Sequence, residues 1–202
     1  MILKTMTVGP VQTNCYLIGD EAAGVCALVD PGDQAQDLLA MAANTGLALT
    51  AIFLTHGHFD HREAVPEILQ VYPDLPVYIH KKDQLQPGLD QRFFYGGPAK
   101  IYGEGDTVSV GSLSFEVLET PGHTAGSVCL LGEELLFAGD TLFAGTCGRC
   151  DLPGGSMREM FSSLHRLAEI PGDRQVLAGH GPSTTLADER LSNPYMRRAL
   201  RK

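Results

Sequence analysis

Three histidines and an aspartate stand within six positions of one another, in the segment Thr55-His56-Gly57-His58-Phe59-Asp60-His61. The segment directly follows the apolar run Ala51–Leu54, which is typical of a buried strand. Imidazole and carboxylate groups bind divalent cations, and a tight turn at Gly57 can direct the first two histidines at one cation and the Asp60-His61 pair at a neighbour. A solvated polar turn explains a single histidine but explains an HxHxDH pattern poorly. The segment therefore predicts a metal site mounted at the end of a strand.

The composition predicts a globular chain without a nucleic-acid or membrane role. The chain has 202 residues, of which 44% are hydrophobic and 19% are charged, and we expect one domain over residues 1–202. The formal net charge of −9 argues against binding a phosphate backbone or a membrane surface, because no cluster of Lys and Arg offers a basic face. No stretch reaches the length of a membrane span and the N-terminus lacks a signal-peptide pattern, so we expect a cytoplasmic protein.

The cysteines are odd in number and irregularly spaced, which does not fit a disulfide framework: Cys15, Cys26, Cys129, Cys147 and Cys150. We expect them to be reduced. The segment Cys147-Gly148-Arg149-Cys150 could form a thioredoxin-like redox pair, but reactive pairs of this kind usually open a helix. Because the following segment, Asp151–Gly155, is typical of a loop, we interpret the two cysteines as loop residues that could also bind adventitious metal.

Hydrophobic periodicity predicts two β-rich halves with similar order. The strands expected in the first half are Met1–Val8, Asn14–Ile18, Val25–Val29, Ala51–Leu54 and Val77–Ile79. Those expected in the second half are Thr107–Val110, Leu113–Leu118, Ser127–Leu131, Leu135–Ala138 and Gln175–Ala178. Helices are expected from Asp33 to about Asn44, from about Arg62 to Val71, and from Ser156, where Glu159 completes a capping-box pattern. This rhythm suggests two packed sheets with helices outside. The segment Lys82–Lys100, rich in glycine and proline, is expected to be a long loop or a broken helix that could cover a site.

Three further candidate ligands each follow an apolar strand and a glycine: His123, Asp140 and His180. Glycine lets the backbone turn sharply, so the side chain that follows can approach a metal closely. His80 also follows a strand, but it lacks the preceding glycine and two lysines follow it, which favours a surface residue or a residue just outside the ligand set. His165 falls inside the helix that begins at Ser156, and we expect it to face solvent or to pack.

The seven candidates, in their order along the chain, resemble the ligands of the metallo-β-lactamase superfamily, and the resemblance extends from Asn14 to about Arg197. It implies an α/β fold, an αββα sandwich of two mixed β-sheets flanked by helices. It also implies two divalent metal ions, for which we expect zinc, with iron or manganese as alternatives. One ion would be held by His56, His58 and His123, the second by Asp60, His61 and His180, with Asp140 bridging them.

Within the superfamily, Thr141-Leu142-Phe143 and Cys147-Gly148-Arg149 are similar to the glyoxalase II branch, the hydroxyacylglutathione hydrolases. Gly179–Pro182 and Asn193–Tyr195 resemble the short bacterial members of this branch. The resemblance implies hydrolysis of a small-molecule thioester, S-lactoylglutathione or a related hydroxyacyl thioester, by a metal-bridging hydroxide. Asp60 would orient the hydroxide and take up its proton, and Arg149 would bind a glutathione carboxylate. The chain departs from the larger members, whose additional C-terminal helical segment also contacts glutathione.

Other readings of the same residues stay open. The segment Gly148-Arg149-Cys150-Asp151 resembles a persulfide dioxygenase on the same fold, which would use a single iron at His56, His123 and Asp140. Another hydrolase of the superfamily, such as a lactonase, would keep both metals and change only the substrate. A non-enzymatic metal scaffold would keep the ligands but needs no open coordination position.

Overall fold

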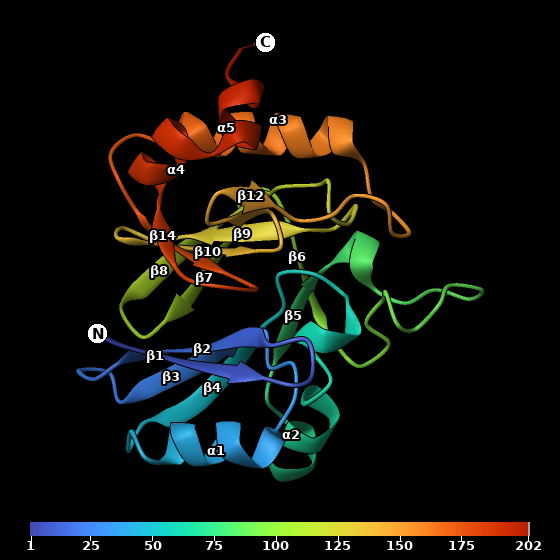
Figure 1. The fold of residues 1–202 in the computed structure, drawn as a ribbon. Helices are drawn as coiled ribbons and strands as arrows, with labels where there is room; N and C mark the ends of the chain where they lie inside the picture. The colour runs from blue at the N-terminus through green and yellow to red at the C-terminus, as the bar shows by residue number, and fades with distance from the viewer. Residues whose placement is uncertain (202) are drawn as a thin grey trace.

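In the computed structural model, which describes residues 1–201, two β-sheets pack face to face and helices cover both outer surfaces (Figure 1). The first sheet has the order β1 (Ile2–Val8), β2 (Thr13–Asp20), β3 (Val25–Val29), β4 (Ala48–Phe53), β5 (Val77–His80) and β6 (Lys100–Tyr102). The second has the order β14 (Thr184–Thr185), β13 (Gln175–Ala178), β10 (Leu135–Gly139), β9 (Val128–Leu131), β8 (Leu113–Glu119) and β7 (Thr107–Val110). The expected α/β sandwich of two sheets is confirmed.

Both sheets are mixed, and α-helices make the crossovers between parallel neighbours except between β5 and β6, which an irregular segment joins. Strands β1, β2 and β3 pair antiparallel, whereas β3, β4, β5 and β6 pair parallel. In the second sheet β10 and β13 are parallel and the other pairs are antiparallel. Parallel neighbours need a long connection. It is supplied by α1 (Ala35–Ala43) between β3 and β4, by α2 (Val65–Val71) between β4 and β5, and by α3 (Met157–Ala168) between β10 and β13.

Three apolar layers hold the sandwich together. Leu28, Leu38 and Ile52 belong to the layer between the first sheet and its helices. Phe53 and Phe137 lie in the layer between the two sheets, and the third layer joins the second sheet to the C-terminal helices. Because each sheet is covered on both faces, β2 and β10 are buried at every position rather than alternating between buried and exposed residues.

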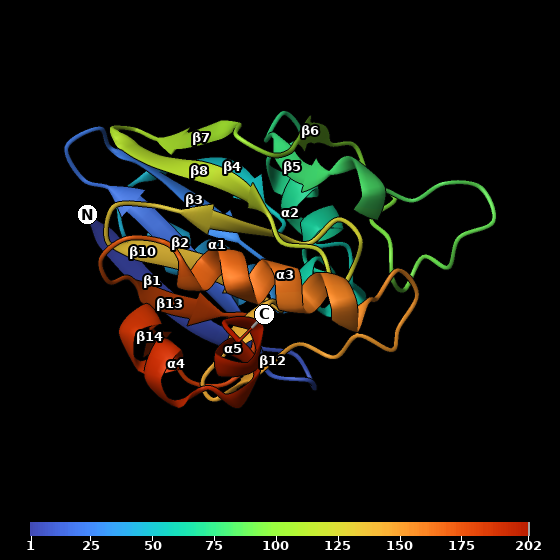
Figure 2. The same ribbon diagram turned by 90° about the horizontal axis from the view of Figure 1, so that it is seen from above.

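Helix α3 begins where the sequence predicts. The Ser156 hydroxyl accepts a hydrogen bond from the backbone N–H of Glu159 at 3.3 Å, which satisfies one of the free donors of the first turn. The helix turns Met160, Leu164 and Leu167 inward against the second sheet. Figure 2 shows α3 lying over that sheet, with α4 (Leu186–Ser192) and α5 (Pro194–Ala199) beside it.

Several boundaries differ from the expected ones. The helix expected from about Arg62 begins at Val65, because the preceding residues form the short 3₁₀ turn η1 (Phe59–His61). Strand β6, helices α4 and α5, and the short strands β11 (Leu142–Phe143), β12 (Thr146–Cys147) and β14 were not expected. No helix within residues 1–201 is both long and apolar enough to cross a membrane.

The expected loop between the lysine-rich turn and β6 is confirmed. After the 3₁₀ turn η2 (Lys81–Asp83), the backbone of residues 84–99 is irregular, and the segment projects from one edge of the sandwich (Figures 1 and 2). Its base is fixed by the backbone N–H of Leu85, which donates to the carbonyl of Tyr95 at 2.8 Å.

Candidate metal centre

The candidate ligands all follow strands that end at one edge of the sandwich. Strand β4 leads to the histidine segment, β8 to His123, β10 to Asp140 and β13 to His180. Strands β10 and β13 run parallel, and β8 runs in the same direction because β9 is antiparallel to both β8 and β10. Their carboxyl ends therefore meet at the same edge, and residues from distant parts of the chain come together there.

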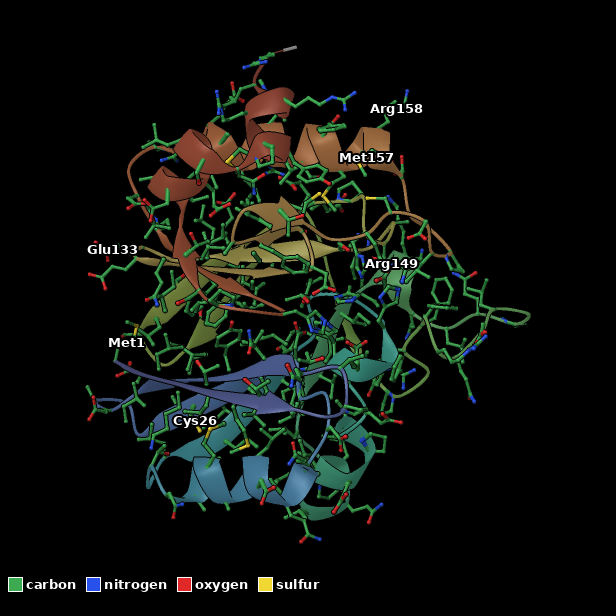
Figure 3. All side chains as sticks on the ribbon, in the orientation of Figure 1. Met1, Cys26, Glu133, Arg149, Met157 and Arg158 are labelled. Atoms are coloured by element: carbon green, nitrogen blue, oxygen red, sulfur yellow. The ribbon has the colours of Figure 1, made fainter. Side chains whose placement is uncertain are left out.

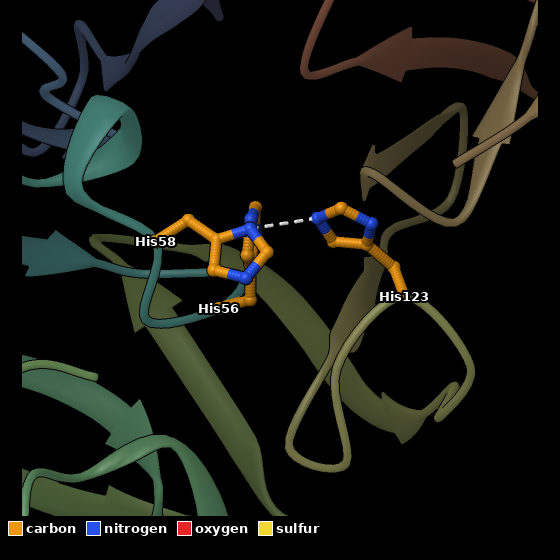
Figure 4. Close-up of side chains that lie close together, drawn as sticks. All are labelled: His56, His58 and His123. Carbon is orange, nitrogen blue, oxygen red and sulfur yellow. Dashed lines mark hydrogen bonds between the residues drawn. The ribbon is translucent and has the colours of Figure 1, made fainter. Parts of the chain in front are cut away.

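His56, His58 and His123 form a compact group of three imidazoles (Figure 4). The Nδ1 atom of His58 lies 2.8 Å from the Nε2 atom of His123, although the two residues are 65 positions apart. The ring centroid of His56 lies 4.6 Å from that of His58 and 4.8 Å from that of His123. Each residue has a nitrogen within 4.8 Å of the others, which is the arrangement expected of three ligands around one cation.

Asp60, His61 and His180 form a second group beside the first. The Oδ2 atom of Asp60 lies 3.3 Å from Nε2 of His180 and 3.5 Å from Nε2 of His61. The two imidazole nitrogens are 3.4 Å apart. The turn at Gly57 and η1 thus separate the HxHxDH segment into two groups, as the sequence predicts.

Asp140 lies between the two groups. One carboxylate oxygen, Oδ1, is 3.4 Å from Nε2 of His61, and the other, Oδ2, is 3.4 Å from Nε2 of His123 and 3.6 Å from Nε2 of His180. A carboxylate that contacts ligands of both groups can bridge two cations.

Unpaired polar atoms in this centre fit metal ligation. Within residues 1–201, the buried atoms without a hydrogen-bond partner are His56 Nε2, His58 Nε2 and Asp140 Oδ1. Buried polar atoms are almost always hydrogen-bonded, and leaving one unpaired costs about 1–3 kcal/mol. All three belong to the candidate ligands, so a bound cation would satisfy groups that the protein itself leaves unpaired.

Burial keeps the first two histidines neutral. Removal from water, followed by the charges of neighbouring imidazoles, lowers the pKa of His56 well below its ordinary value. The same burial, followed by the charges of His123 and His61, lowers the pKa of His58 to about 3. Both rings therefore carry a free lone pair at pH 7, which is the form that binds a metal.

Carboxylates have the opposite effect in the second group. Burial acts to lower the pKa of His61, but Asp140, Asp30 and Asp60 outweigh it and raise the pKa to about 9. Burial acts to raise the pKa of Asp60, but hydrogen bonding to His180 and other contacts hold it well below its usual range. The second group thus favours a positive charge at its centre, which a bound cation would provide in place of a proton.

A hydrogen-bond network outside the ligands orients two of them. Asp30, at the end of β3, accepts from the backbone N–H of Thr55 at 2.7 Å and from its hydroxyl at 2.6 Å. The same carboxylate lies 3.0 Å from Nδ1 of His61, and the Thr55 hydroxyl lies 3.2 Å from Nδ1 of His56. Contacts of this kind fix the ring orientation and leave Nε2 of each ring for the metal.

Glycines allow the close packing of the ligand loops. Gly139 and Gly122 precede Asp140 and His123 by one residue and have φ of +46° and +146°, which other residues rarely adopt. A Cβ atom at Gly179 would collide with Oδ1 of Asp140 and lie 2.6 Å from Cε1 of His61. The glycine before each later ligand therefore has the structural role expected of it.

Arg149 lies outside the ligand groups, on a loop that contacts them. Its backbone carbonyl is 2.7 Å from Nδ1 of His123, but its guanidinium is exposed and forms a two-pronged ion pair with Asp151, with both contacts at 2.7 Å. Figure 3 shows Arg149 toward the edge from which residues 84–99 project. The expected contact between Arg149 and the substrate stays a prediction. Asp151 would compete with a substrate carboxylate for the Arg149 guanidinium.

The remaining histidines and cysteines do not join the ligand groups. His80 is buried rather than at the surface, because β5 pairs with β6 and its Nε2 atom lies 3.0 Å from Oε1 of Glu119 on β8. His165 lies 3.2 Å from the carbonyl of Ala199, a packing contact between α3 and α5. All five cysteines are free thiols. Cys150 lies in a loop, as expected, whereas Cys147 is the last residue of the short strand β12 and not a loop residue, because it pairs with Leu142 of β11.

Three residues that support the ligands from outside were not expected from the sequence. Asp30 and Thr13 contact ligands directly, whereas Asp83 contacts the loops that carry them. The Thr13 hydroxyl donates to Oδ2 of Asp60 at 3.0 Å. Of these three residues, only Asp30 could have been found from the sequence. It is an acidic residue that follows a strand and directly precedes Pro31 and Gly32, and the later candidate ligands are likewise polar residues that follow strands.

Comparison with known proteins identifies relatives over nearly the whole chain. An uncharacterized protein of Aquifex aeolicus is 38% identical over 96% of this chain and 97% of its own length. The probable metallo-hydrolase YqgX of Bacillus subtilis is 36% identical over 96% of each chain. A hydroxyacylglutathione hydrolase of Salmonella typhi is 40% identical over 84% of this chain, which corresponds to 62% of that enzyme.

Solved structures share the fold. The BLEG-1 B3 metallo-β-lactamase superposes with a TM-score of 0.87, at 33% identity and with 96% of this chain and 99% of that chain covered. TTHA1623 in a di-iron-bound form gives 0.81 at 39% identity, covering 95% and 99%. ETHE1 from Myxococcus xanthus gives 0.80 at 33% identity, covering 96% and 84%. The family model of the metallo-β-lactamase superfamily matches residues 8–180, a range that contains all seven candidate ligands. The chain therefore belongs to the metallo-β-lactamase superfamily.

Proposed function

We propose that this protein is a binuclear metallohydrolase that cleaves thioesters, with S-lactoylglutathione or a related hydroxyacyl thioester as its substrate. The observation that carries the proposal is the position of Asp140, whose carboxylate lies within 3.4–3.6 Å of ligands from both groups. The hydroxyacylglutathione hydrolase of Salmonella typhi, 40% identical over 84% of this chain, supports the thioester as the substrate class.

The two ligand groups differ in charge. His56, His58 and His123 offer three imidazoles, whereas the second group contains the carboxylate of Asp60. Two divalent ions bound here would supply a hydroxide nucleophile near neutral pH and polarise the substrate carbonyl. Zinc is the ion we propose, and iron or manganese could occupy the same nitrogen and oxygen ligands. The di-iron-bound form of TTHA1623 shows that iron occupies a related protein.

Asp60 is positioned to accept the proton of the nucleophile. Its Oδ2 atom accepts from Thr13 and faces Nε2 of His180, and its pKa lies well below the ordinary value. An ionised carboxylate at this point can orient the nucleophile and accept its proton as the tetrahedral intermediate forms. A thiolate leaves without a strong general acid, which suits a thioester better than an amide.

Aromatic side chains border the centre on two sides. The ring of Phe93, from the projecting segment 84–99, lies 5.5 Å from that of His58, and the ring of Phe143 lies 6.1 Å from that of His180. Apolar walls of this kind exclude water from an acyl group bound between them. We assign the carboxylate of the thiol half to Arg149, which would exchange its contact with Asp151 for the substrate. The reduced thiols favour a cytoplasmic protein.

An activity panel tests the substrate assignment. The purified full chain, loaded with zinc, is offered S-lactoylglutathione, a lactam, a lactone and glutathione persulfide under the same conditions. We expect release of the thiol from S-lactoylglutathione at a rate that exceeds turnover of the other three. Hydrolysis of the lactam or lactone alone would contradict the thioester assignment. Oxygen consumption with the persulfide, together with one iron per chain, would overturn the hydrolase itself.

A further inference from the structure

Asp83 is a buried carboxylate outside both ligand groups. It closes the 3₁₀ turn η2 after β5, and its side chain is fully buried. Its Oδ2 atom accepts from the backbone N–H of Gly57 at 2.9 Å and from the hydroxyl of Thr124 at 2.7 Å. Its Oδ1 atom accepts from the backbone N–H of Gly126 at 2.8 Å. Three donors therefore converge on one carboxylate.

The three donors lie on the two loops that carry the three-histidine group. Gly57 stands between His56 and His58, and Thr124 directly follows His123. The first loop extends from the first sheet and the second loop from the second sheet, so Asp83 connects the two halves of the sandwich at this group. Hydrogen bonds to a carboxylate are stronger than those between neutral groups, which makes the connection rigid.

The sequence is adapted to this contact. A Cβ atom at Gly57 would lie 2.7 Å from the backbone oxygen of Asp83, and one at Gly126 would collide with its carboxylate. Both positions therefore require glycine for the backbone to reach Asp83. The carbonyl of Asp83 also accepts from the backbone N–H of Tyr95 at 2.9 Å, which anchors the segment 84–99 to the same point.

The second ligand group has different supports. Thr13 donates to Asp60, and Asp30 contacts His61. The hydrogen bonds of the Asp83 side chain go instead to the two loops of the three-histidine group. A change at Asp83 should therefore alter one metal position and spare the other.

We propose that Asp83 is a positioning residue that holds the loops of His56, His58 and His123 at the spacing a cation needs. Asp83 thereby sets the metal affinity of this position, and the affinity of the Asp60-His61-His180 position does not depend on it. The proposal rests on the binuclear centre put forward above. It assigns to Asp83 no contact with substrate or metal.

The test is a zinc titration of the full-length Asp83→Asn variant against a chromophoric chelator. Asparagine keeps one acceptor oxygen, but its NH₂ group must face a backbone N–H or the Thr124 hydroxyl, so at least one contact is lost. Reference variants His123→Ala and His180→Ala assign the two binding steps. Because loss of a partner outside the ligands typically costs 10–100-fold in affinity, we expect the His123-dependent step to weaken at least about tenfold. The His180-dependent step should change less than about twofold.

Asp20→Asn is the matched control. Asp20 is also a buried carboxylate with several donors, since it accepts from the backbone N–H and the hydroxyl of Ser112. It ends β2, whereas Thr13, which contacts Asp60, begins that strand. This variant should lower the melting temperature while leaving both zinc steps unchanged.

The outcomes separate this proposal from the proposed function. Two unchanged zinc steps in Asp83→Asn, with only a lower melting temperature, would show that Asp83 has a merely structural role. Equal weakening of both steps would also overturn the proposal. If Asp83→Asn yields no folded protein, Thr124→Val removes one donor at nearly constant shape, and an unchanged His123-dependent step there would contradict the role. A wild-type chain that binds no zinc would contradict the binuclear centre itself.

Discussion

The Nδ1 atom of His61 lies 3.0 Å from the Oδ2 atom of Asp30, and the two residues are 31 positions apart in the chain. Asp30 directly follows β3 and the histidine segment follows β4, so the parallel pairing of these strands brings the two side chains together. The carboxylate holds a proton on Nδ1 and thereby directs Nε2 toward Asp60 and Asp140. The geometry of the second ligand group thus depends on a residue that is not itself a proposed ligand.

Removal of the Asp30 charge should weaken the second metal position. In Asp30→Asn we expect the affinity of the His180-dependent zinc step to fall about 10–100-fold, because the proton on Nδ1 of His61 loses its anionic acceptor. Zinc titration against a chelator measures this. Asp33→Asn, a change at a nearby carboxylate whose Oδ1 accepts from the backbone N–H of Gln34, should leave both steps unchanged. Equal zinc affinities in wild type and Asp30→Asn would contradict a role of Asp30 in the second metal position.

Arg149 should affect substrate binding more than chemistry. In Arg149→Ala we expect KM for S-lactoylglutathione to rise with little change in kcat, since an exposed guanidinium contributes equally to ground state and transition state. Asp151→Asn frees Arg149 from its ion pair and should lower KM. Steady-state kinetics of the two variants measure both effects. A parallel fall in kcat and kcat/KM for Arg149→Ala would instead indicate a role in the transition state.

The two neighbouring cysteines should be unreactive. Burial, with a smaller effect from Cys150, raises the pKa of Cys147 to about 12, and burial also raises the pKa of Cys150. The thiolate is the reactive form, so we expect Cys147 in the folded protein at pH 7.5 to react with iodoacetamide at least about 100-fold more slowly than in urea. Mass spectrometry of digested samples resolves each site. Rapid labelling, or ready formation of a Cys147–Cys150 disulfide, would support the redox reading of this segment.

Asp20 should make stability depend on pH in the acid range. Hydrogen bonds from the hydroxyl and backbone N–H of Ser112 lower the pKa of Asp20 to about 2, below the value near 3.9 of an unfolded chain. Its contribution to stability is therefore full above about pH 4 and is lost as the pH falls toward 2. Urea unfolding should show a larger difference between wild type and Asp20→Asn at pH 6 than at pH 2.5. A constant difference would contradict the lowered pKa.

Local patterns predicted which residues gather in the candidate metal centre, because each candidate ligand is marked by its neighbours in the sequence. Asp140 and His180 follow an apolar strand and a glycine, and the structure brings both to the same edge. This pattern lies within a few consecutive residues, so it can be recognised without knowing how the strands pair. The strand order and the partners across the sandwich are not local.

The contacts of Asp30 and Asp83 show why the rest could not be predicted. Their partners lie between 25 and 43 positions away, and only the pairing of strands and sheets brings these residues together. The burial of His80 was not predicted for the same reason, because its partner Glu119 comes from the other sheet. Helices α4 and α5, of seven and six residues, are too short for periodicity to stand out from the surrounding sequence.

The metal content of the wild-type chain tests the central claim most directly. After exposure to zinc and dialysis, elemental analysis should find two ions per chain. The variants His58→Ala and Asp140→Ala should lose bound zinc and thioester hydrolysis together, because each removes a group from the shared centre. A wild-type chain that retains no zinc, or an Asp140→Ala variant that retains two ions with full activity, would contradict the binuclear centre.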